Sequence, residues 1–234
     1  MKTFVKKLLP PFILGWYHQV LAFLAMVIYG FPSNKLIVIG VTGTNGKSTV
    51  VNLIGEILKI SGHQVAWTAT TNFFLDGQER LNDQKMTMPG RFKTQKFLAD
   101  SVRAGCKYAI IETSSEGIKQ YRHWGINYDL AVFTNLTPEH IEAHGSFENY
   151  KKAKGRLFKH LTKFPKKKIN NQLIDKTIIV NTDDQYADYF LNFPADKKLA
   201  FSIKKKSDFR ATSIKLDSNG TSFTLQPTPY NLQN

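Results

Sequence analysis

Short apolar runs alternate with amphipathic segments along most of the chain, and this alternation is its main structural signal. The apolar runs predict buried strands at Leu36–Ile39, Val65–Thr68, Tyr108–Glu112, Leu130–Thr134 and Thr177–Asn181. A helical period predicts helices at Lys47–Ile60, Thr94–Ala104, Phe147–Leu161 and Gln185–Leu191. Strands that alternate with helices predict an α/β fold with a mostly parallel sheet and helices on both faces. Ligands bind such sheets at the edge where the strands end.

Two segments depart from this alternation. The stretch "FRATSIKLDSNGTSFTLQ", Phe209–Gln226, places two alternating segments around Ser-Asn-Gly, which predicts an antiparallel hairpin at the end of the fold. Residues Asn72–Gly90 are polar with little periodicity. They are expected to form a long loop, and loops of that length often carry function.

A glycine-rich stretch, "GVTGTNGKSTV", joins the first predicted strand to the first predicted helix. Gly43 and Gly46 allow backbone amides to turn toward an anion, and the helix adds its positive N-terminal end. Lys47 is expected to reach the β- and γ-phosphates of a nucleotide, and Ser48 to ligate Mg²⁺. The general motif requires glycine at position 41, where Val41 stands. The stretch therefore predicts a P-loop-type sheet with an unusual phosphate loop.

An apolar stretch of about 18 residues, 12–29, precedes this loop and follows a basic N-terminus. It predicts a helix that packs on the domain, lies in a membrane interface or spans the membrane. The lysines before it favour a cytoplasmic N-terminus. A span would have to return within "GFPSNK" to keep the phosphate loop in the cytoplasm, and this segment is too short. The spanning arrangement is therefore excluded, and the other two remain.

Charge is the unusual feature of the composition, with a formal net charge of +14. Lysine runs such as "PKKKIN" are typical of solvated loops, and the excess charge also attracts anionic ligands or an anionic membrane. No recognition motif accompanies it, so nucleic acid is not predicted as a partner. The single cysteine, Cys106, excludes an intramolecular disulfide and a cysteine-clustered metal site, which suits a reducing cytoplasm.

Several stretches together resemble the ATP-dependent Mur ligases and the related folylpolyglutamate synthases. They are "TGTNGKST" in the phosphate loop, "IETSSEGIKQYRH" (Ile111–His123), "FTNLTPEHIEAHGSFENYKKAKGRLF" (Phe133–Phe158) and "VNTDDQYA" (Val180–Ala187). These enzymes join a carboxylate to an amine through an acyl phosphate. The resemblance implies the central ATP-binding domain of such a ligase, with ATP and two Mg²⁺ ions as cofactors.

The resemblance also implies roles for individual residues. Catalytic roles fall on Lys47, Glu112, His140 and Lys154. Nucleotide contacts fall on Gly43, Thr44, Asn45, Gly46, Lys47, Ser48, Thr49 and, at the adenine, Asn181. Metal ligands are Ser48, Glu112, His140 and Lys154, the last as a lysine that CO₂ converts to a carbamate in many Mur ligases. Glu139 and Glu142 stand where the family usually has aspartates.

Substrate residues resemble those of the Mur ligases that add the third residue of the peptidoglycan stem peptide. The matching positions are Thr87, Ser114, Gln120 and Arg122, and an arginine suits an acidic muramoyl-peptide substrate. Met88 replaces a second threonine, and Glu116 replaces a histidine, which are departures from that pattern.

The resulting expectation divides the chain in two. Residues 1–34 form the apolar helix with its basic flank, and residues 35–234 form the central ATP-binding domain, with the C-terminal ligase domain expected to be absent. The enzyme is expected in the cytoplasm, with peripheral contact at the inner face of the membrane through residues 4–31. Two alternatives remain: a folylpolyglutamate-type ligase, and a membrane-associated nucleotide-binding domain without ligase activity.

Overall fold

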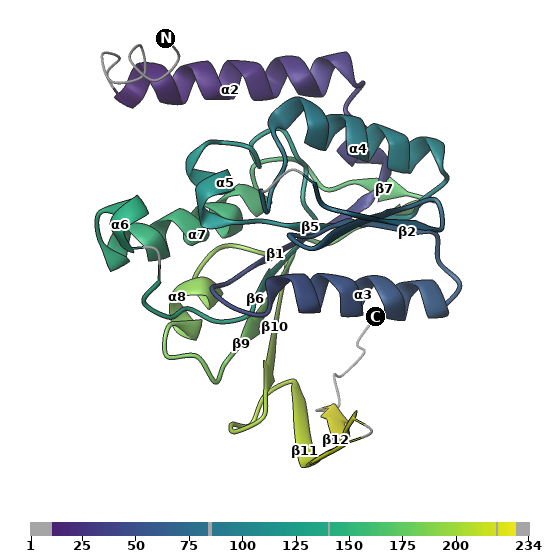
Figure 1. Cartoon of the computed structure of the whole chain (residues 1–234), viewed down its shortest axis with the longest axis vertical. Helices are drawn as coiled ribbons and strands as arrows, with labels where there is room; N and C mark the ends of the chain where they lie inside the picture. Colours follow the sequence, from purple (N-terminus) through teal and green to yellow (C-terminus); the bar gives the residue numbers. More distant parts are fainter. Residues whose placement is uncertain (1–10, 84–85, 140, 219, 228–234) are drawn as a thin grey trace.

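The centre of the molecule is a parallel sheet built around its first strand. The computed structural model describes residues 11–83, 86–139, 141–218 and 220–227 (Figure 1). Strand β1 (Ile37–Thr42) lies between β5 (Tyr108–Glu112) and β6 (Leu130–Phe133), parallel to both. Beyond them lie β2 (Val65–Thr68) and β9 (Thr177–Asn181), again parallel. All of these strands therefore end at one edge of the sheet, as the sequence predicted.

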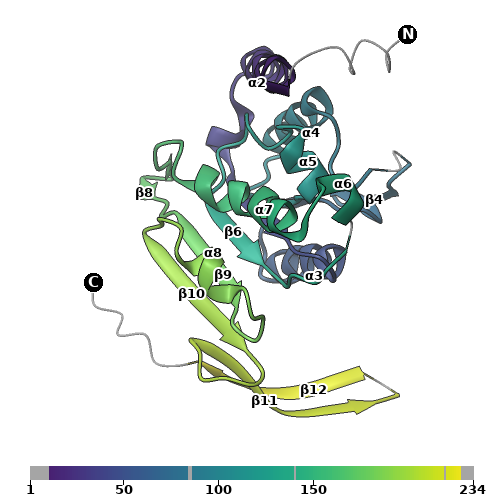
Figure 2. The same cartoon turned by 90° about the vertical axis from the view of Figure 1, so that its left-hand side faces the viewer.

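Further strands extend this sheet at both sides, and each side ends in an antiparallel pair. Beyond β9, strand β10 (Lys197–Ser202) is followed by β11 (Phe209–Asp217) and β12 (Gly220–Pro227), which form the predicted terminal hairpin. Beyond β2 lie β3 (Asn72–Leu75) and β4 (Gln78–Leu81). The hairpin β11–β12 projects from the body of the molecule in Figure 2.

Helices cover both faces of the parallel strands. Helix α3 (Lys47–Ile60) lies below the sheet in Figure 1, and α4 (Arg91–Arg103), α5 (Ser115–Lys119) and α7 (Phe147–Leu161) lie above it. The short helix α8 (Ala187–Leu191) packs beside α7. The remaining short elements are η1 (Pro32–Lys35), α6 (Ile141–His144), and the small hairpin of β7 (Lys168–Ile169) and β8 (Gln172–Leu173).

Alternate residues of β1 supply two separate hydrophobic clusters. Ile39 and Val41 join the cluster under α3, whereas Val38 joins the larger cluster under α4 and α7. Gly40 also faces α7, because a Cβ there would lie 3.3 Å from Cδ1 of Leu157 in α7 and 2.8 Å from the ring of Tyr128. All six residues of β1 are buried, which explains its continuous apolar sequence.

The expectation of one long loop at Asn72–Gly90 was wrong in its first half. Residues Asn72–Leu81 form the β3–β4 hairpin, whose turn is Asp76–Gly77 with φ of 54° and 72°. Two positive φ values at an Asp-Gly pair are typical of a tight hairpin turn. Strand β4 is exposed along its whole length and polar, so it lacks the apolar alternation by which strands are recognised.

The apolar N-terminal helix, α2 (Pro11–Ile28), packs on the outside of α4 as an additional layer (Figure 1). Ala22, Ala25 and Met26 are buried against the domain. The opposite side of α2 exposes large apolar side chains, including Trp16 at 69% and Ile28 at 65% exposure. Within the residues described, no helix has the length and apolar character needed to cross a bilayer.

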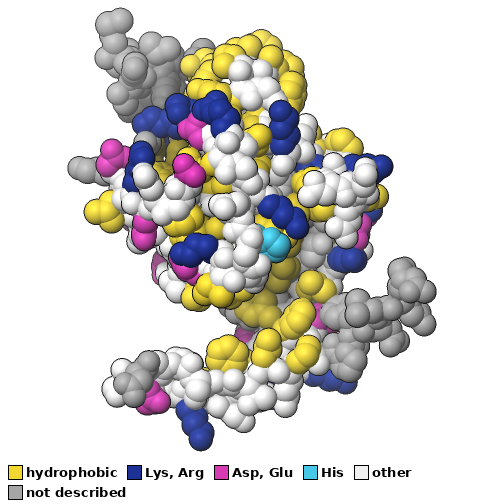
Figure 3. All heavy atoms as spheres, turned by 90° about the vertical axis from the view of Figure 1, so that its right-hand side faces the viewer, with side chains coloured by type: hydrophobic (Ala, Val, Ile, Leu, Met, Phe, Trp, Pro, Cys, Tyr) yellow, Lys and Arg dark blue, Asp and Glu magenta, His cyan; other side chains and the backbone are white. Residues whose placement is uncertain are grey.

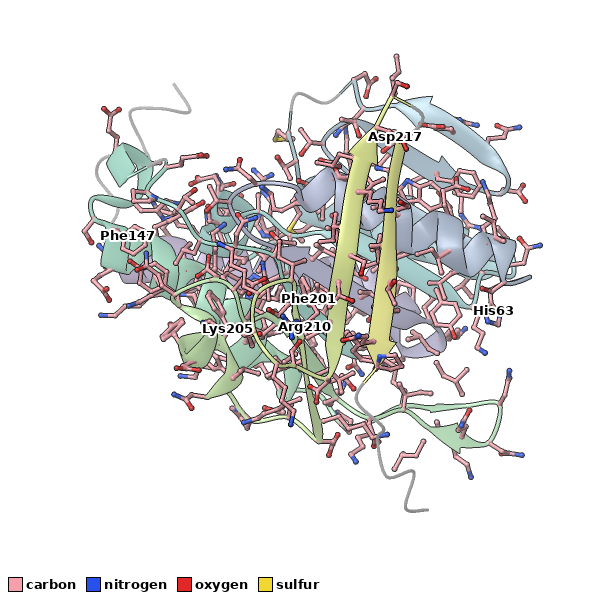
Figure 4. All side chains as sticks on the ribbon, turned by 90° about the horizontal axis from the view of Figure 1, so that it is seen from below. His63, Phe147, Phe201, Lys205, Arg210 and Asp217 are labelled. Carbon is pink, nitrogen blue, oxygen red and sulfur yellow. The ribbon has the colours of Figure 1, made fainter. Side chains whose placement is uncertain are left out.

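Apolar side chains gather in two places on the surface shown in Figure 3: over α2, and around the terminal hairpin. On the hairpin the exposed apolar residues include Leu216, Phe223 and Leu225, and on α3 they include Leu53 and Ile57. Figure 4 shows the two long strands of the hairpin crossing beneath the body, with Arg210 beside Phe201 where β11 leaves β10.

Candidate active site

The phosphate loop is held in shape by two glycines. Gly46 has φ of 74° just before α3, a left-handed conformation that other residues adopt at a cost of roughly 1–2 kcal/mol. A Cβ on Gly43 would lie 1.9 Å from Oγ1 of Thr134, so only glycine fits there. The loop therefore sits directly on the end of β6, and its backbone amides stand at the N-terminus of α3.

Asn135 fixes the loop from the side. Its carbonyl accepts a hydrogen bond from the amide of Thr44 at 2.9 Å, and its Oδ1 accepts one from the amide of Asn45 at 2.8 Å. The hydroxyl of Thr134 donates to the carbonyl of Asn45 at 3.0 Å. These bonds come from residues about ninety positions away, so the loop takes its shape from the assembled sheet. Thr49 follows in the first turn of α3 and is exposed.

Lys47 is positioned over the loop by its own backbone. Its Nζ donates to the carbonyl of Thr44 at 2.7 Å. Burial lowers the pKa of Lys47, and the nearby carboxylates of Glu112 and Glu139 oppose that shift. The ammonium group therefore lies in an anionic environment beside the loop amides, where a nucleotide phosphate would be bound.

Glu112 ends β5 and lies against the first turn of α3, as the sequence predicted. The side chain is 1% exposed, yet no cation of the described protein pairs with it. Its carboxylate accepts hydrogen bonds from the Ser48 hydroxyl at 2.7 Å, from the amide of Thr70 at 2.7 Å and from the Thr70 hydroxyl at 2.9 Å. A buried charge surrounded by neutral donors fits Mg²⁺, which prefers oxygen ligands such as carboxylates and hydroxyls.

Lys154 is brought to the loop by α7. It is 1% exposed, its Nζ donates to the carbonyl of Gly43 at 2.5 Å, and it lies 4.4 Å from the ring centroid of Tyr150. Burial lowers the pKa of Lys154 to about 7, assisted by the charge of Lys47 and opposed by Glu139 and Glu112. A large fraction of this amine is therefore neutral near neutral pH, and the neutral form is the nucleophile.

The second predicted metal site lies partly outside the described residues. His140 is one of the residues that the structure does not describe. Glu139, just before it, accepts a hydrogen bond from Nδ2 of Asn45 at 3.1 Å and acts electrostatically on Lys154. Among the described residues, no three His, Cys, Asp or Glu side chains form a cluster that could hold a metal.

Asn181 ends β9 at the same edge of the sheet. Its Nδ2 donates to the carbonyl of Thr134 at 2.9 Å, and its Oδ1 accepts from the amide of Asp183 at 3.0 Å. Asp184 continues this turn and accepts from the amide of Leu136 at 2.7 Å. The segment is tied to the strand that supports the phosphate loop.

The four predicted substrate residues lie around α5 and the segment before α4. The hydroxyls of Thr87 and Thr70 lie within hydrogen-bond distance at 3.0 Å, and the Thr70 hydroxyl donates to Glu112, which links Thr87 to Glu112. Ser114 caps α5 by accepting from the amide of Gly117 at 3.1 Å. The guanidinium of Arg122 donates to Oε1 of Gln120 at 2.7 Å, and it also contacts the carbonyl of Met88.

Two residues of this region had no role in the sequence-based prediction. Thr70 bridges Glu112 and Thr87, and its signal was a pair of threonines, Thr70 and Thr71, one residue beyond the end of a buried strand. Arg91 donates to the carbonyl of Gln120. Burial lowers the pKa of Arg91, and the charge of Arg122 lowers it further. Two arginines thus lie close together beside α5, both bonded to Gln120, and such a pair suits a ligand with more than one negative charge.

Comparisons with known proteins identify the family of the chain. The family model "Mur ligase middle domain" matches residues 41–233. A UDP-N-acetylmuramoyl-L-alanyl-D-glutamate–2,6-diaminopimelate ligase from Bacillus cereus is 37% identical over 90% of this chain and 41% of its own length. The enzyme of the same name from Halalkalibacterium halodurans is 35% identical over 89% of this chain and 41% of its own. The chain thus spans about two fifths of the length of these curated relatives.

Solved structures of Mur ligases and of folylpolyglutamate synthases are similar to this chain as well. A structure of a UDP-N-acetylmuramoyl-L-alanyl-D-glutamate–2,6-diaminopimelate ligase has a TM-score of 0.66 and 31% identity over 81% of this chain and 37% of its own. A folylpolyglutamate synthase from Mycobacterium tuberculosis has a TM-score of 0.67 at 14% identity over 89% of this chain and 51% of its own, which is a likeness of fold. The chain belongs to the Mur ligase family and contains its middle domain.

Proposed function

We propose that the protein is an ATP-dependent carbon–nitrogen ligase that activates the carboxylate of a muramoyl peptide as an acyl phosphate. One observation carries this proposal: Lys47, Lys154 and the Ser48–Glu112 pair converge on the same phosphate loop. A domain that only binds nucleotide has no need for a buried lysine with a lowered pKa behind the loop. The names of the relatives support the choice of substrate.

The chain's own residues supply positioning and charge in this reaction. A carboxylate oxygen of the acceptor attacks the γ-phosphorus of ATP, the bond to the bridging oxygen breaks and ADP leaves. An amine then attacks the acyl carbon, loses a proton, and phosphate leaves. Lys47 and the loop amides stabilise the charge that develops on the transferred phosphoryl group. Ser48 and Glu112 would hold Mg²⁺, which neutralises phosphate charge when bound.

Lys154 is proposed to carry a carbamate in the active enzyme. Its neutral amine attacks CO₂, forms a C–N bond and releases a proton, so a cation becomes an anion beside Lys47. Together with His140, this anion would form the second metal site. Incubation with ¹³C-bicarbonate should give a carbamate signal in the ¹³C NMR spectrum. The signal should be absent from the Lys154→Arg variant, and its presence there would contradict the assignment.

The acceptor is proposed to bind at the two arginines beside α5. Arg122 is held by Gln120 and contacts the carbonyl of Met88, the residue after Thr87, and Arg91 donates to the carbonyl of Gln120. This arrangement suits the carboxylates of a muramoyl peptide. The amine substrate is proposed to be a diamino acid, as in the names of the relatives.

Phosphate release tests the proposed reaction. The protein is supplied with ATP, Mg²⁺, UDP-muramoyl-dipeptide and diaminopimelate, and each is omitted in turn. Release that requires both the muramoyl peptide and the amine supports the proposal. Release that requires a folate instead would establish the folylpolyglutamate alternative. Mg²⁺-dependent ATP binding without release under any combination would favour the non-catalytic alternative.

Peripheral membrane contact through α2 is proposed as well, at the inner face of the cytoplasmic membrane. The exposed side of α2 carries Trp16, Tyr17, Phe23 and Ile28, and α2 contains no acidic residue. Lysines at positions 2, 6 and 7 precede it in the sequence. An apolar helix face with adjacent positive charge suits the interface of an anionic bilayer.

Vesicle sedimentation tests this contact. The protein should sediment with vesicles that contain phosphatidylglycerol, and Trp16→Ala with Ile28→Ala should reduce the bound fraction at least threefold. Phe223→Ala with Leu225→Ala removes similar exposed apolar area from the terminal hairpin, far from α2, and serves as the control. An equal loss in the control pair would contradict an interface at α2.

A further inference from the structure

A pocket lies between the β3–β4 hairpin and helix α4. It has a volume of about 570 Å³, and its lining comes from the end of β2, from the hairpin, from Pro89 and from α4. A space of this size is typical of sites for small organic ligands. Among the described residues, neither the phosphate loop nor the four predicted substrate residues contribute to this lining. The pocket is therefore separate from the candidate active site.

One face of the hairpin and one face of the helix form the two sides of the pocket. Phe73 and Leu75 of β3 pair with Arg80 and Gln78 of β4, so these four side chains share a face of the hairpin. The lining residues of α4 have the helical spacing of three and four: Lys93, Lys96, Phe97 and Asp100. Both elements therefore turn a mixture of aromatic, polar and charged groups toward the same space.

The inner part of the pocket is apolar except for one hydroxyl. The rings of Phe73 and Phe97 lie 6.4 Å apart between centroids, and Pro89 beside them is buried. Thr68, at the end of β2, is 0% exposed, and its Oγ1 has no hydrogen-bond partner among the described residues. A buried hydroxyl without a partner costs free energy, so a ligand group that bonds Thr68 would remove this cost.

The rim of the pocket has more cations than acids. Three basic and two acidic residues line it. One of the acids, Asp100, is paired with Lys96 at 2.7 Å and also contacts Arg103, which lies outside the lining. Arg80 donates to Oε1 of Gln78 at 3.0 Å, and within the described part of the chain it forms no ion pair. The guanidinium group of Arg80 is therefore available to an anionic group of a ligand.

We propose that this pocket binds a small aromatic carboxylate. Its carboxylate would pair with Arg80, its ring would pack against Phe73 and Phe97, and a hydrogen-bonding group at its inner end would reach Thr68. Such a ligand is neither the nucleotide nor the muramoyl peptide, so this site goes beyond the proposed function. Pro89 follows directly after Met88, so the pocket adjoins the substrate segment without sharing its residues.

Calorimetric titration of indole-3-acetate tests the charge in this proposal, with the phosphate loop saturated by a non-hydrolysable ATP analogue. Arg80→Gln should weaken binding roughly fivefold or more, and the neutral indole-3-acetamide should bind the wild type more weakly by a similar factor. Asp76→Asn removes an acid from the lining and should strengthen binding of the carboxylate about twofold. Asparagine keeps the hairpin turn, because it tolerates the left-handed backbone at this position.

The role of the Thr68 hydroxyl is tested with a matched pair of probes. The ring N–H of indole-3-acetate can donate to Oγ1, whereas 1-naphthaleneacetate has a similar shape and no such donor. Thr68→Val should weaken binding of indole-3-acetate roughly threefold or more and leave binding of 1-naphthaleneacetate unchanged. Because Oγ1 has no partner in the protein itself, the variant should keep the thermal unfolding temperature of the wild type.

Arg156→Gln is the control, because Arg156 is exposed on α7 and lines a different pocket. It should leave the affinity for indole-3-acetate unchanged, and every variant should keep the affinity for the ATP analogue, which verifies folding. Absence of saturable binding, equal affinity for the acid and the amide, or equal weakening by Arg156→Gln would overturn the proposal. None of these titrations depends on phosphate release, so this proposal and the proposed ligase reaction can fail separately.

Discussion

Two buried carboxylates, Glu112 and Asp129, lie at opposite edges of the same sheet and have different kinds of partner. Glu112 lies at the edge where the parallel strands end, and it receives hydrogen bonds from a serine, a threonine hydroxyl and an amide. Asp129 lies at the other edge, just before β6, and is 0% exposed. It contacts Nζ of Lys167 at 2.5 Å and of Lys176 at 3.3 Å, and accepts from the amide of Val38 at 2.8 Å.

The difference lies in what balances the charge. At Asp129 the protein supplies its own cations, and both lysines also bond backbone or amide oxygens, so this edge is electrostatically complete. At Glu112 the hydrogen-bond partners are neutral, and Lys47 and Lys154 act on the carboxylate through their charge without forming an ion pair with it, so its oxygens can take a cation from solution. A buried acid with neutral donors therefore indicates a metal site, whereas a buried acid with lysines indicates a structural connection between strands.

The largest loss of stability is expected on substitution of Asp129. Asp129→Ala leaves Lys167 and Lys176 buried without their carboxylate, and should lower the free energy of unfolding by about 3–5 kcal/mol in urea denaturation. The control is Asp175→Ala, which breaks exposed ion pairs with Lys166 and Lys197 and should cost about 0–1 kcal/mol. Similar losses in the two variants would contradict the distinction between buried and surface pairs.

The next effect concerns Lys154 and pH. The pKa of Lys154 is lowered from 10.5 to about 7, so the unfolded chain holds a proton there that the folded protein releases. Burial therefore destabilises the fold fully below pH 7, and this penalty disappears as the pH rises toward 10.5. Relative to Lys154→Met, the wild type should gain roughly 4–5 kcal/mol of stability across that window, which is the lowering from 10.5 to about 7 converted at about 1.36 kcal/mol for each pH unit.

This comparison is made by urea denaturation at several pH values in bicarbonate-free buffer. Lys167 and Lys176 are present in both proteins, so their own titration cancels in the difference. A difference between wild type and variant that is constant with pH would mean that Lys154 keeps its proton in the folded state.

A smaller effect is expected at Glu112, and it concerns ligand binding more than stability. Glu112→Gln should reduce the strengthening of ATP binding by Mg²⁺ about tenfold, or about 1.4 kcal/mol, as measured by calorimetry. Stability without Mg²⁺ should change little, because the neutral donors around the side chain remain. Glu116→Gln, on the exposed side of α5, is the control. A large loss of stability in Glu112→Gln would place this residue with Asp129 as a structural acid.

The smallest effect is expected at Thr70. Thr70→Val removes the hydroxyl that bonds Glu112 and Thr87 but keeps the backbone amide, so Mg²⁺-dependent ATP binding should weaken by about 0.5–1 kcal/mol. Thr70→Ser, which keeps the hydroxyl, should restore most of the affinity. No recovery in the serine variant would show that the threonine methyl group, rather than the hydrogen bond, matters here.

The sequence predicted those parts of the fold whose signals are local. Helices α3 and α7 and strands β2, β5 and β9 have the predicted bounds, because continuous apolar runs and amphipathic periods define them. Strand β10 was not predicted, since its first half is lysine-rich and exposed. Helix α4 begins at Arg91 and not at the predicted Thr94. Its N-cap is Gly90, which offers no side-chain cap, so no signal in the sequence marked this start.

The residues of the candidate site also fall into two groups, those with a local sequence signal and those that only long-range packing brings to the site. Lys47, Ser48 and Glu112 were predicted from motifs at strand ends, and the structure brings them together. The contact of Lys154 with Gly43 spans 111 residues, and only the packing of α7 on the sheet creates it. Arg91 received no role from the sequence, although it ends the stretch that contains Thr87, so its position beside Arg122 emerged only from the fold.

The pairing of β1 also has a consequence for synthesis of the protein. Its neighbours β5 and β6 lie about 70 and 90 residues further along the chain, and Thr134 and Asn135, which shape the phosphate loop, come later still. Contacts of such long range form late, because a long loop must close before they stabilise anything. A ribosome must therefore release most of the domain before the nucleotide pocket exists, and capture of a labelled ATP analogue by stalled nascent chains would report when folding is complete.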